Sequence, residues 1–233
     1  MFKELKYGAE SFLDVLYPRV CKACSLALFQ HEQQICLNCL SSLPVTASWK
    51  QNFNPMELIF KGRMRFIYQY GFLNFEKKGL TQQLMHQIKY HKQTDLAIYL
   101  GRLFANEIQE ISHSVDYLIP IPLHHKKYKK RGFNQAMKIA KGFQDIWDIP
   151  ILEHGLIKTV DNVSQTTMKR INKFSNVKNT YDWSGLDISK DAHLMLIDDV
   201  CTTGSTLEAC GITLQKASFT NISVSTLAVV SPL

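Results

Sequence analysis

Two adjacent carboxylates stand in front of a run of small, hydroxyl-bearing residues near the end of the chain. Residues 197–206 read IDDVCTTGST, and the apolar run HLMLI at 193–197 precedes the acids. Such a run is typical of a strand buried on both faces. We therefore expect Asp198 and Asp199 at the carboxyl end of a parallel sheet, where open α/β folds bind their ligands.

The residues that follow the acid pair suit a phosphate group. Backbone N–H groups in a turn that leads into a helix bind anions, and Gly204 permits a close backbone approach. Hydroxyl groups that can donate to phosphate oxygens are present in the same turn, at Thr202, Thr203, Ser205 and Thr206. Carboxylates about one sugar's length away can accept hydrogen bonds from ribose hydroxyls, so the spacing predicts a ribose-5-phosphate site. The alternative is a helix N-cap with a Gly-Ser turn and no ligand; the P-loop pattern GxxxxGK[ST] is absent.

Four of the six cysteines form two Cys-x-x-Cys pairs, Cys21 with Cys24 and Cys36 with Cys39. Each pair places two sulfurs on one edge of a tetrahedron, and two pairs complete a structural Zn²⁺ site with no open position. A reducing cytosol disfavours disulfides, and neither pair has the βαβ surroundings of a redox motif. Redox cysteines remain the competing interpretation. His31 lies between the pairs and could replace one ligand, although a loop role suits it better.

A basic stretch without acidic residues extends from Asp116 to Asp145. Its densest part contains the four lysines Lys126, Lys127, Lys129 and Lys130. We expect this part to be a loop, and three interpretations are open: a solvated face, a mobile segment that closes over diphosphate, or a surface for a nucleic-acid backbone. Tyr128 and Phe133 would supply base stacking in the third. A second acid-free basic stretch, 162–181, would enlarge that surface if it bordered the same cleft.

Strands must alternate with helices to bring these segments together. Apolar spacing predicts helices over 2–16, 78–90, 95–111, 134–147 and 205–216. Strands are predicted at 65–73, 117–123, 193–197 and 221–230, the second ending at its prolines. This alternation predicts an α/β fold with a mostly parallel sheet flanked by helices.

The composition fits a packed globular protein, with 45% hydrophobic and 20% charged residues among 233. It excludes intrinsically disordered and fibrous classes, and the formal charge of +7 favours anionic partners. No apolar run reaches the roughly 18–20 residues of a membrane span. Acids within the first 16 residues argue against a secretory signal, so we expect a cytoplasmic protein. The segment 44–55, with Pro, Ser and Asn, divides a zinc-binding module at 1–50 from a main domain at 51–233.

The segment at 197–206 resembles the phosphoribosyl-diphosphate (PRPP) motif of type I phosphoribosyltransferases, with Cys201 where the motif usually has an aliphatic residue. More of the chain resembles one branch of that superfamily, the ComF (competence protein F) family. The resemblance is carried by the paired Cys-x-x-Cys motifs, IKYHKQTDLA at 88–97, IPIPLHHKKYKKRGFNQA at 119–136 and SQTTMKRINKFSNVKNTY at 164–181. The order and combination of these segments are specific, and they extend over nearly the whole chain.

The resemblance implies a type I phosphoribosyltransferase fold, in which a smaller hood covers the parallel sheet. It implies that Asp198 and Asp199 bind the ribose 2′ and 3′ hydroxyls, and that residues 202–206 hold the 5′-phosphate. Mg²⁺ would accompany the diphosphate of PRPP.

The diphosphate itself would lie at the turn after the IPIP sequence. By the same resemblance, Leu123 and His124 would form the diphosphate-binding loop. We assign Arg131 and Lys89 as further cations at the diphosphate. No residue is recognisable as a general base or as the reader of an acceptor base.

Three functions are therefore open at the level of sequence. As a phosphoribosyltransferase of nucleotide metabolism, the chain would displace diphosphate from PRPP with a nitrogen nucleophile. As a non-catalytic module, it would bind PRPP or a nucleotide while the basic stretch binds single-stranded DNA. The ComF resemblance implies a role in natural competence, with DNA-uptake proteins as partners. A scaffold built around zinc, without affinity for PRPP, is a third hypothesis.

Overall fold

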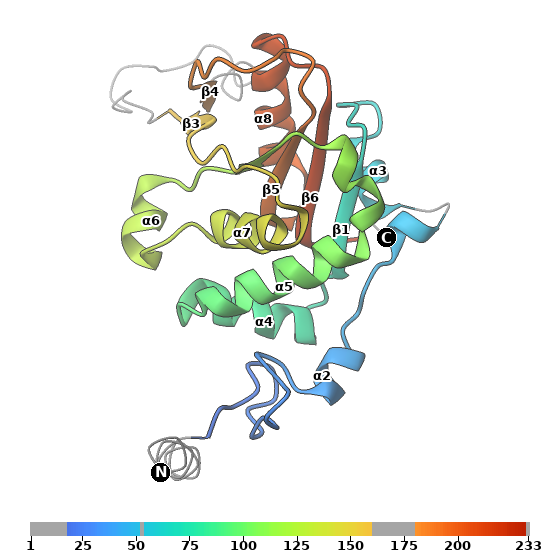
Figure 1. Ribbon diagram of the computed structural model, residues 1–233, viewed down its shortest axis with the longest axis vertical. Helices are drawn as coiled ribbons and strands as arrows, with labels where there is room; N and C mark the ends of the chain where they lie inside the picture. Colours follow the sequence, from blue (N-terminus) through green and yellow to red (C-terminus); the bar gives the residue numbers. More distant parts are fainter. Residues whose placement is uncertain (1–17, 52–53, 160–179, 232–233) are drawn as a thin grey trace, which may run out of the picture.

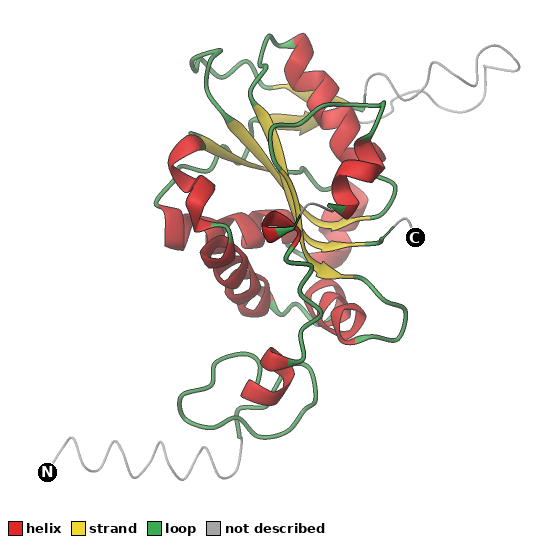
Figure 2. Ribbon diagram, turned by 90° about the vertical axis from the view of Figure 1, so that its right-hand side faces the viewer, coloured by secondary structure: helices red, strands yellow, loops and turns green. Residues whose placement is uncertain are grey.

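The computed structural model describes residues 18–51, 54–159 and 180–231. A four-stranded sheet lies at its centre, in the order β1-β6-β5-β2, and every neighbouring pair is parallel. Its strands are β1 (Gln69–Asn74), β2 (Tyr117–Pro120), β5 (Leu194–Cys201) and β6 (Ile222–Val229). Helices cover both faces of this sheet (Figure 1, Figure 2), which confirms the predicted α/β class. The helix predicted over 2–16 lies outside the described residues.

The four longer helices lie close to their predicted positions. They are α4 (Leu80–Tyr90), α5 (Thr94–Glu107), α7 (Gln135–Trp147) and α8 (Ser205–Lys216). Helix α5 ends before the predicted residue 111 because the chain tightens into a 3₁₀ turn at Gln109–Ser114. Three short helices were not predicted: α2 (Leu37–Ser41), α3 (Pro55–Phe60) and α6 (His125–Arg131). A further 3₁₀ turn spans Ser48–Lys50.

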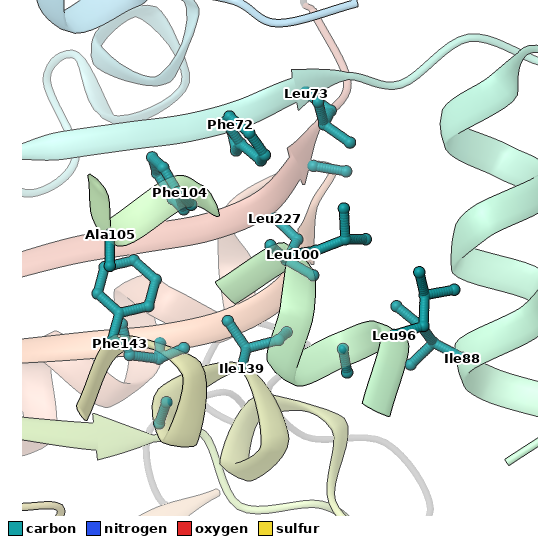
Figure 3. Close-up of a cluster of buried hydrophobic side chains, with 14 of the residues drawn as sticks. Phe72, Leu73, Ile88, Leu96, Leu100, Phe104, Ala105, Ile139, Phe143 and Leu227 are labelled. Atoms are coloured by element: carbon teal, nitrogen blue, oxygen red, sulfur yellow. The ribbon is translucent and has the colours of Figure 1, made fainter. Parts of the chain in front are cut away.

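Strand β5 is buried on both faces, as its apolar run predicted. Met195 and Ile197 belong to the cluster that α4, α5 and α7 form on one side of the sheet. Leu194 and Leu196 belong to the cluster on the other side, with α3 and α8. Figure 3 shows the first cluster, in which the rings of Phe104 and Phe143 pack edge to face with their centroids 5.3 Å apart. This two-sided packing fixes the end of β5, where the acid pair begins.

The basic stretch after β2 is a helix, so the expectation of a loop was wrong. The imidazole of His124 accepts a hydrogen bond from the backbone N–H of Lys126 at 3.2 Å, which caps the first turn of α6. Gly132 adopts a left-handed conformation, with φ of 82°, and ends the helix. Helix α6 therefore has a defined start and stop in a stretch without apolar periodicity.

A small antiparallel pair, β3 (Leu156–Lys158) and β4 (Tyr181–Trp183), lies beside the main sheet and was not predicted. Its strands are too short for a pattern of alternating residues to be recognised. The second basic stretch, 162–181, falls almost entirely outside the described residues. Its place beside the first stretch stays a prediction.

The segment that follows the cysteines joins the edge of the main sheet. Val45 forms an antiparallel bridge with Leu73, and the Thr46 backbone N–H donates to the Phe72 carbonyl at 2.9 Å. The rings of Trp49 and Phe104 pack together with their centroids 5.8 Å apart. The domain boundary at residue 50 stays a prediction. Across the described part of the chain, we find no helix with both the length and the apolar character needed to cross a membrane.

Candidate functional site

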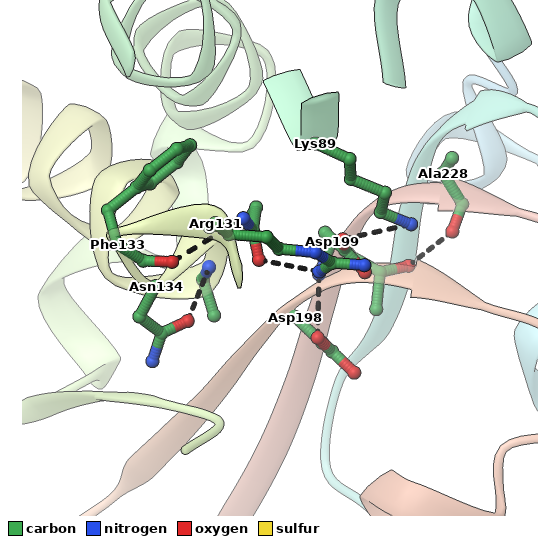
Figure 4. Close-up of polar contacts among 10 residues, drawn as sticks. Lys89, Arg131, Phe133, Asn134, Asp198, Asp199 and Ala228 are labelled. Carbon is green, nitrogen blue, oxygen red and sulfur yellow. Dashed lines mark hydrogen bonds and ion pairs between the residues drawn. The ribbon is translucent and has the colours of Figure 1, made fainter. Parts of the chain in front are cut away.

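Several of the predicted site residues line one cavity of about 200 Å³ at the carboxyl end of the sheet, here called the acid-pair cavity. The predicted residues in its wall are Lys89, Leu123, His124, Lys127, Arg131, Asp198, Asp199 and Thr206. They come from α4, the loop after β2, α6, the end of β5 and the start of α8. Segments more than a hundred residues apart in sequence thus meet at one end of the sheet (Figure 4).

The two carboxylates differ in their surroundings. Asp199 faces a cation, because the Nζ atom of Lys89 lies 3.0 Å from its Oδ2. Asp198 accepts a hydrogen bond from the backbone N–H of Asp199 at 2.8 Å. Burial and the neighbouring charge of Asp199 raise the pKa of Asp198 to about 7, against the smaller opposite effects of that hydrogen bond and of Lys89. Near neutral pH the pair therefore carries less than two full negative charges, which eases the approach of an anionic ligand.

Cations surround the acid pair on several sides. Figure 4 shows Lys89 and Arg131 extending toward the two carboxylates from different helices. The Nη1 of Arg131 donates to the side-chain oxygen of Gln135 at 2.8 Å, which orients the guanidinium. Lys127 lines the cavity one helical turn before Arg131, whereas Lys126, Lys129 and Lys130 do not line it. The four predicted lysines are thus divided between two environments.

Two residues of the small antiparallel pair also line this cavity and were missed at the sequence level. The Nζ of Lys158 donates to the hydroxyl of Tyr181 at 3.1 Å and lies 4.9 Å from the centre of its ring. Burial lowers the pKa of Lys158, and the positive charge of Lys127 adds to this effect. Lys158 lies outside the segments that carry the family resemblance, and Tyr181 is only the last residue of one of them. The pairing of β3 with β4 brings the two residues together.

The turn between β5 and α8 encloses a smaller cavity of about 40 Å³, which opens beside Asp198. Thr202, Thr203, Ser205 and Thr206 are exposed in this turn, and Gly204 is buried with φ of 73°. A Cβ atom on Gly204 would lie 2.7 Å from side-chain atoms of both Ile59 and Phe60. The structure therefore requires glycine here for its backbone conformation and for packing against α3, a reason that the sequence did not reveal.

Arg63 links this turn to α8, and the sequence analysis did not identify it. Its Nη1 donates to the Thr203 carbonyl at 2.6 Å, and its Nη2 contacts the Glu208 carboxylate on α8. Within the turn, the hydroxyls of Thr203 and Ser205 are 3.0 Å apart. The Thr203 carbonyl thus accepts its hydrogen bond from Arg63. The first N–H groups of a helix have no partner within the helix, so the start of α8 is suited to an anion.

The outer surface of α6 differs from the sequence expectation in one respect. Phe133 is only 9% exposed and packs in the core, so it cannot stack on a nucleic-acid base. Tyr128 is 52% exposed, as stacking requires. Tyr90, at the end of α4, is equally exposed, and Lys130 and Arg131 lie 5.8 and 6.0 Å from the centre of its ring.

The four cysteines of the two pairs come together as predicted. The sulfur atoms of Cys21, Cys24, Cys36 and Cys39 all lie within 4.8 Å of one another. The backbone N–H groups of Ala23 and Cys36 point at the Cys21 sulfur, 3.4 and 3.3 Å away. Burial raises the pKa of Cys21, but hydrogen bonds from the backbone N–H groups of Cys24, Cys36 and Ala23, together with the Cys24 side chain, outweigh it and bring the pKa down to about 7. Four cysteine sulfurs this close together could hold Zn²⁺.

Glu32 fixes the loop between the two cysteine pairs. Its carboxylate oxygens accept hydrogen bonds from the backbone N–H groups of Phe29 and Leu37, both at 2.7 Å. These two bonds lower the pKa of Glu32, which keeps the side chain ionised although the residue is only 5% exposed. The loop is thus held in place by the chain's own groups, and His31 is exposed within it.

Comparisons with known proteins agree with the resemblance seen in the sequence. Competence protein F of Haemophilus influenzae is 29% identical over 154 residues, which are 62% of this chain and 66% of that protein. DNA utilization protein YhgH of Escherichia coli K12 is 25% identical over 134 residues, 53% of this chain and 56% of that protein. Competence protein ComFC of Bacillus subtilis is 22% identical over 223 residues, 95% of this chain and 82% of that protein.

No protein-family model matches the chain. A purine phosphoribosyltransferase from Pyrococcus horikoshii aligns with 60% of this chain and 77% of its own at 21% identity, with a TM-score of 0.30. That score is too low for the fold to be inferred from the alignment. The matched region covers about two thirds of competence protein F and just over half of YhgH. The chain is thus similar in sequence to competence and DNA utilization proteins of three bacteria.

Proposed function

We propose that the chain binds PRPP, or a related phosphoribosyl ligand, in the acid-pair cavity and acts as a phosphoribosyltransferase-like protein of natural competence. The observation that carries this proposal is the meeting of the acid pair, the small turn before α8 and several cations around one cavity. The competence role comes from the names of the H. influenzae and B. subtilis relatives.

The charges in the cavity match the charges of the ligand. The 5′-phosphate would lie in the turn at 202–206, and the ribose hydroxyls would donate to Asp198 and Asp199. The diphosphate would then face the cations Lys89, Lys127, Arg131 and Lys158, which line the same cavity. Cations fixed around a leaving diphosphate stabilise the charge that develops on it, and such fixed electrostatics supply much of the catalysis in comparable reactions.

A magnesium ion fits this arrangement as a companion of the ligand. Within the described residues, no group of three acidic, histidine or cysteine side chains forms a metal site at this cavity. Mg²⁺ in phosphate sites is commonly held by one or two carboxylates together with the phosphates of the substrate. Asp198 and Asp199 could supply the carboxylates, and the bound ion would neutralise charge on the departing diphosphate.

Calorimetric titration of PRPP with Mg²⁺ tests the proposal. We expect saturable binding by the wild-type chain and its loss in the Asp198→Asn/Asp199→Asn double variant, checked for folding by circular dichroism. Asp182→Asn/Asp187→Asn, which changes two exposed carboxylates, is the matched control and should bind normally. A folded Asp198/Asp199 variant with unchanged affinity would contradict the proposed site.

Whether the chain turns over or only binds is a separate test. Release of diphosphate from PRPP in the presence of candidate nitrogen acceptors would make it a transferase. Tight binding without release would make it a non-catalytic module in DNA handling, because folds of one family host both.

A further inference from the structure

A groove of about 680 Å³ lies between the end of α3 and the start of β1, here called the α3–β1 groove. Every residue that lines it falls within 57–69. None of these residues lines the acid-pair cavity or the small cavity in the turn at 202–206. Sites for small molecules have volumes of about 300–1,000 Å³. The groove therefore has room for a ligand that the proposed function does not assign.

Cations line this groove at every second residue of the connection from α3 to β1. They are Lys61, Arg63 and Arg65, and Glu57 is the single acid of the lining. Lys61 and Arg65 are exposed, and neither side chain forms an ion pair or hydrogen bond within the described residues. Even with Arg63 paired to Glu208, two cations thus face one acid, which favours an anionic ligand.

Arg63 is fixed in the wall of the groove and still has donors to spare. Its Nη1 donates to the carbonyls of Ile59 and Thr203 at 3.1 and 2.6 Å, and its Nη2 contacts Glu208. A guanidinium has more N–H groups than these contacts use. Arg63 can therefore donate to an anion in the groove without releasing the turn before α8.

The apolar part of the lining has a packed floor and exposed walls. Phe60 and Phe66 are buried, and their rings pack edge to face with centroids 4.9 Å apart. Leu58 and Ile67 also line the groove and are 41% and 50% exposed. Ligand sites commonly combine such apolar walls with a few polar groups that fix the orientation of the ligand. The exposed walls offer contact area for the flat face of a ring.

Gln69, at the start of β1, brings an unused acceptor to the lining. Its backbone carbonyl accepts from the Nδ2 of Asn54 at 2.6 Å. Its side-chain Oε1 is buried, and within the described part of the chain it has no hydrogen-bond partner. Buried acceptors are normally paired, and an unpaired one costs free energy. A ligand with an N–H donor at this end of the groove would remove that cost.

We propose that the α3–β1 groove binds a nucleoside monophosphate. The phosphate would contact the three cations, and the base would lie on the exposed aliphatic walls with an amino group that donates to Gln69. Glu57 would accept hydrogen bonds from the ribose hydroxyls. Inorganic phosphate would satisfy only the cations, and a fatty acid would leave both Glu57 and Gln69 without a donor. A nucleoside phosphate matches all three features of the lining.

Calorimetric titration of adenosine 5′-monophosphate tests this site. We use the Asp198→Asn/Asp199→Asn variant as the background, so that the acid-pair cavity does not contribute to the binding. We expect one saturable site for adenosine 5′-monophosphate in this background. Binding by the wild-type chain that is lost in the Asp198→Asn/Asp199→Asn variant, or no binding by either, would overturn the proposal.

Charge-changing variants locate the site. In the same background, Lys61→Gln/Arg65→Gln should weaken the binding at least about tenfold, because two charge-assisted hydrogen bonds to the phosphate are lost. Lys77→Gln/Lys78→Gln removes the same charge from exposed positions outside the groove and is the matched control. It should leave the affinity unchanged. Equal effects of the two pairs would show that the ligand responds only to net charge.

Parts of the ligand test its class. Adenosine, which lacks the phosphate, and inorganic phosphate, which lacks the base, should each bind at least about tenfold more weakly than the nucleotide. Gln69→Leu should weaken the binding of adenosine 5′-monophosphate and leave that of inorganic phosphate unchanged, since it removes the acceptor for the amino group. Inorganic phosphate that binds as tightly as the nucleotide would overturn the assignment to a nucleoside.

PRPP titration separates this proposal from the proposed function. Lys61 and Arg65 lie outside the acid-pair cavity, so Lys61→Gln/Arg65→Gln in the otherwise wild-type chain should bind PRPP normally. Absence of PRPP binding by the wild-type chain would contradict the proposed function alone, provided that the groove still takes the nucleotide. Affinities for PRPP and adenosine 5′-monophosphate that fall together in Lys61→Gln/Arg65→Gln would mean one shared site and overturn the proposal.

Discussion

At the scale of single residues, Asp198 illustrates how a group proposed to bind a ligand can lower the stability of the fold. Burial and the charge of Asp199 raise its pKa to about 7, well above the ordinary value of about 3.9 for aspartate. The unfolded chain therefore loses this proton at lower pH than the folded chain does. The free energy of unfolding should fall as pH rises from about 4 to about 7, and the penalty should then stay constant.

We expect Asp198→Asn to raise the melting temperature at pH 8 by roughly 2–6 °C, because the variant has no charge to bury. Asparagine also keeps a side-chain oxygen that can accept from the Asp199 N–H. The gain over wild type should shrink when both proteins are melted at pH 5.5. Asp187→Asn, at an exposed position, should change neither melt. A gain that is independent of pH would contradict the assigned cause.

Single residues also show where sequence reasoning ends. Asp198 and Asp199 could be predicted because they belong to one contiguous motif that follows a buried strand. Arg63, Lys158 and Tyr181 could not, because each reaches the site through tertiary packing alone. Phe133 was misinterpreted for a related reason: an aromatic side chain beside lysines can point into the core as well as toward solvent.

At the scale of elements, the turn into α8 depends on the packing of α3 beneath it. We expect Gly204→Ala to destabilise the chain by about 2–4 kcal/mol, since the variant combines a left-handed conformation with contacts at 2.7 Å to Ile59 and Phe60. Gly185→Ala is a matched control, because Gly185 also has a positive φ of 81° but no atom within 4 Å of a new Cβ. Gly185→Ala should lower the free energy of unfolding, measured in urea, by only about 1–2 kcal/mol. Equal costs would show that α3 does not constrain the turn.

Helix α6 divides its lysines between a cavity and the solvent. We expect Lys127→Ala to weaken PRPP binding about tenfold in calorimetry, because Lys127 lines the acid-pair cavity near the position proposed for the diphosphate. Lys126→Ala, one residue away on the exposed surface, should leave PRPP binding unchanged. Equal effects would mean that the helix acts only through its overall charge. The sequence could not predict this division, because the stretch was expected to be a loop, and a loop has no fixed faces.

At the scale of the whole molecule, the cysteine cluster is continuous with the main core. Cys21, Ile35, Cys39 and Leu43 belong to the same buried cluster as the apolar faces of α4 and α5. Figure 1 shows this segment beyond α4 at one end of the molecule. Loss of the metal should therefore affect more than the cysteine loops.

We expect Cys21→Ser to purify without zinc and to melt at a lower temperature, because structural zinc sites contribute folding free energy directly. Cys201→Ala should retain one zinc ion per chain by elemental analysis, since Cys201 lies at the end of β5 and outside the cluster. A chelator should lower the melting temperature of the wild-type chain and of Cys201→Ala but not that of Cys21→Ser. Zinc-free wild-type protein with an unchanged melt would contradict a structural role.

The parallel sheet and the four longer helices could be predicted because hydrophobic periodicity marks elements of this length. Short elements such as α3, α6, β3 and β4 lack enough residues for a period to emerge. They are specified by caps, by Gly132 and by strand pairing. These same short elements supply Lys158 and Tyr181, which the sequence did not indicate, and Arg131, which it did, so only part of the cavity wall could be predicted along with the motif.

A crystal structure of the chain with ribose 5-phosphate would test the central claim most directly. We predict the phosphate oxygens within about 3 Å of backbone N–H groups at 203–206, and the 2′ and 3′ hydroxyls hydrogen-bonded to Asp198 and Asp199. Ribose 5-phosphate bound elsewhere on the molecule, or absent from the acid-pair cavity at saturating concentration, would contradict the account.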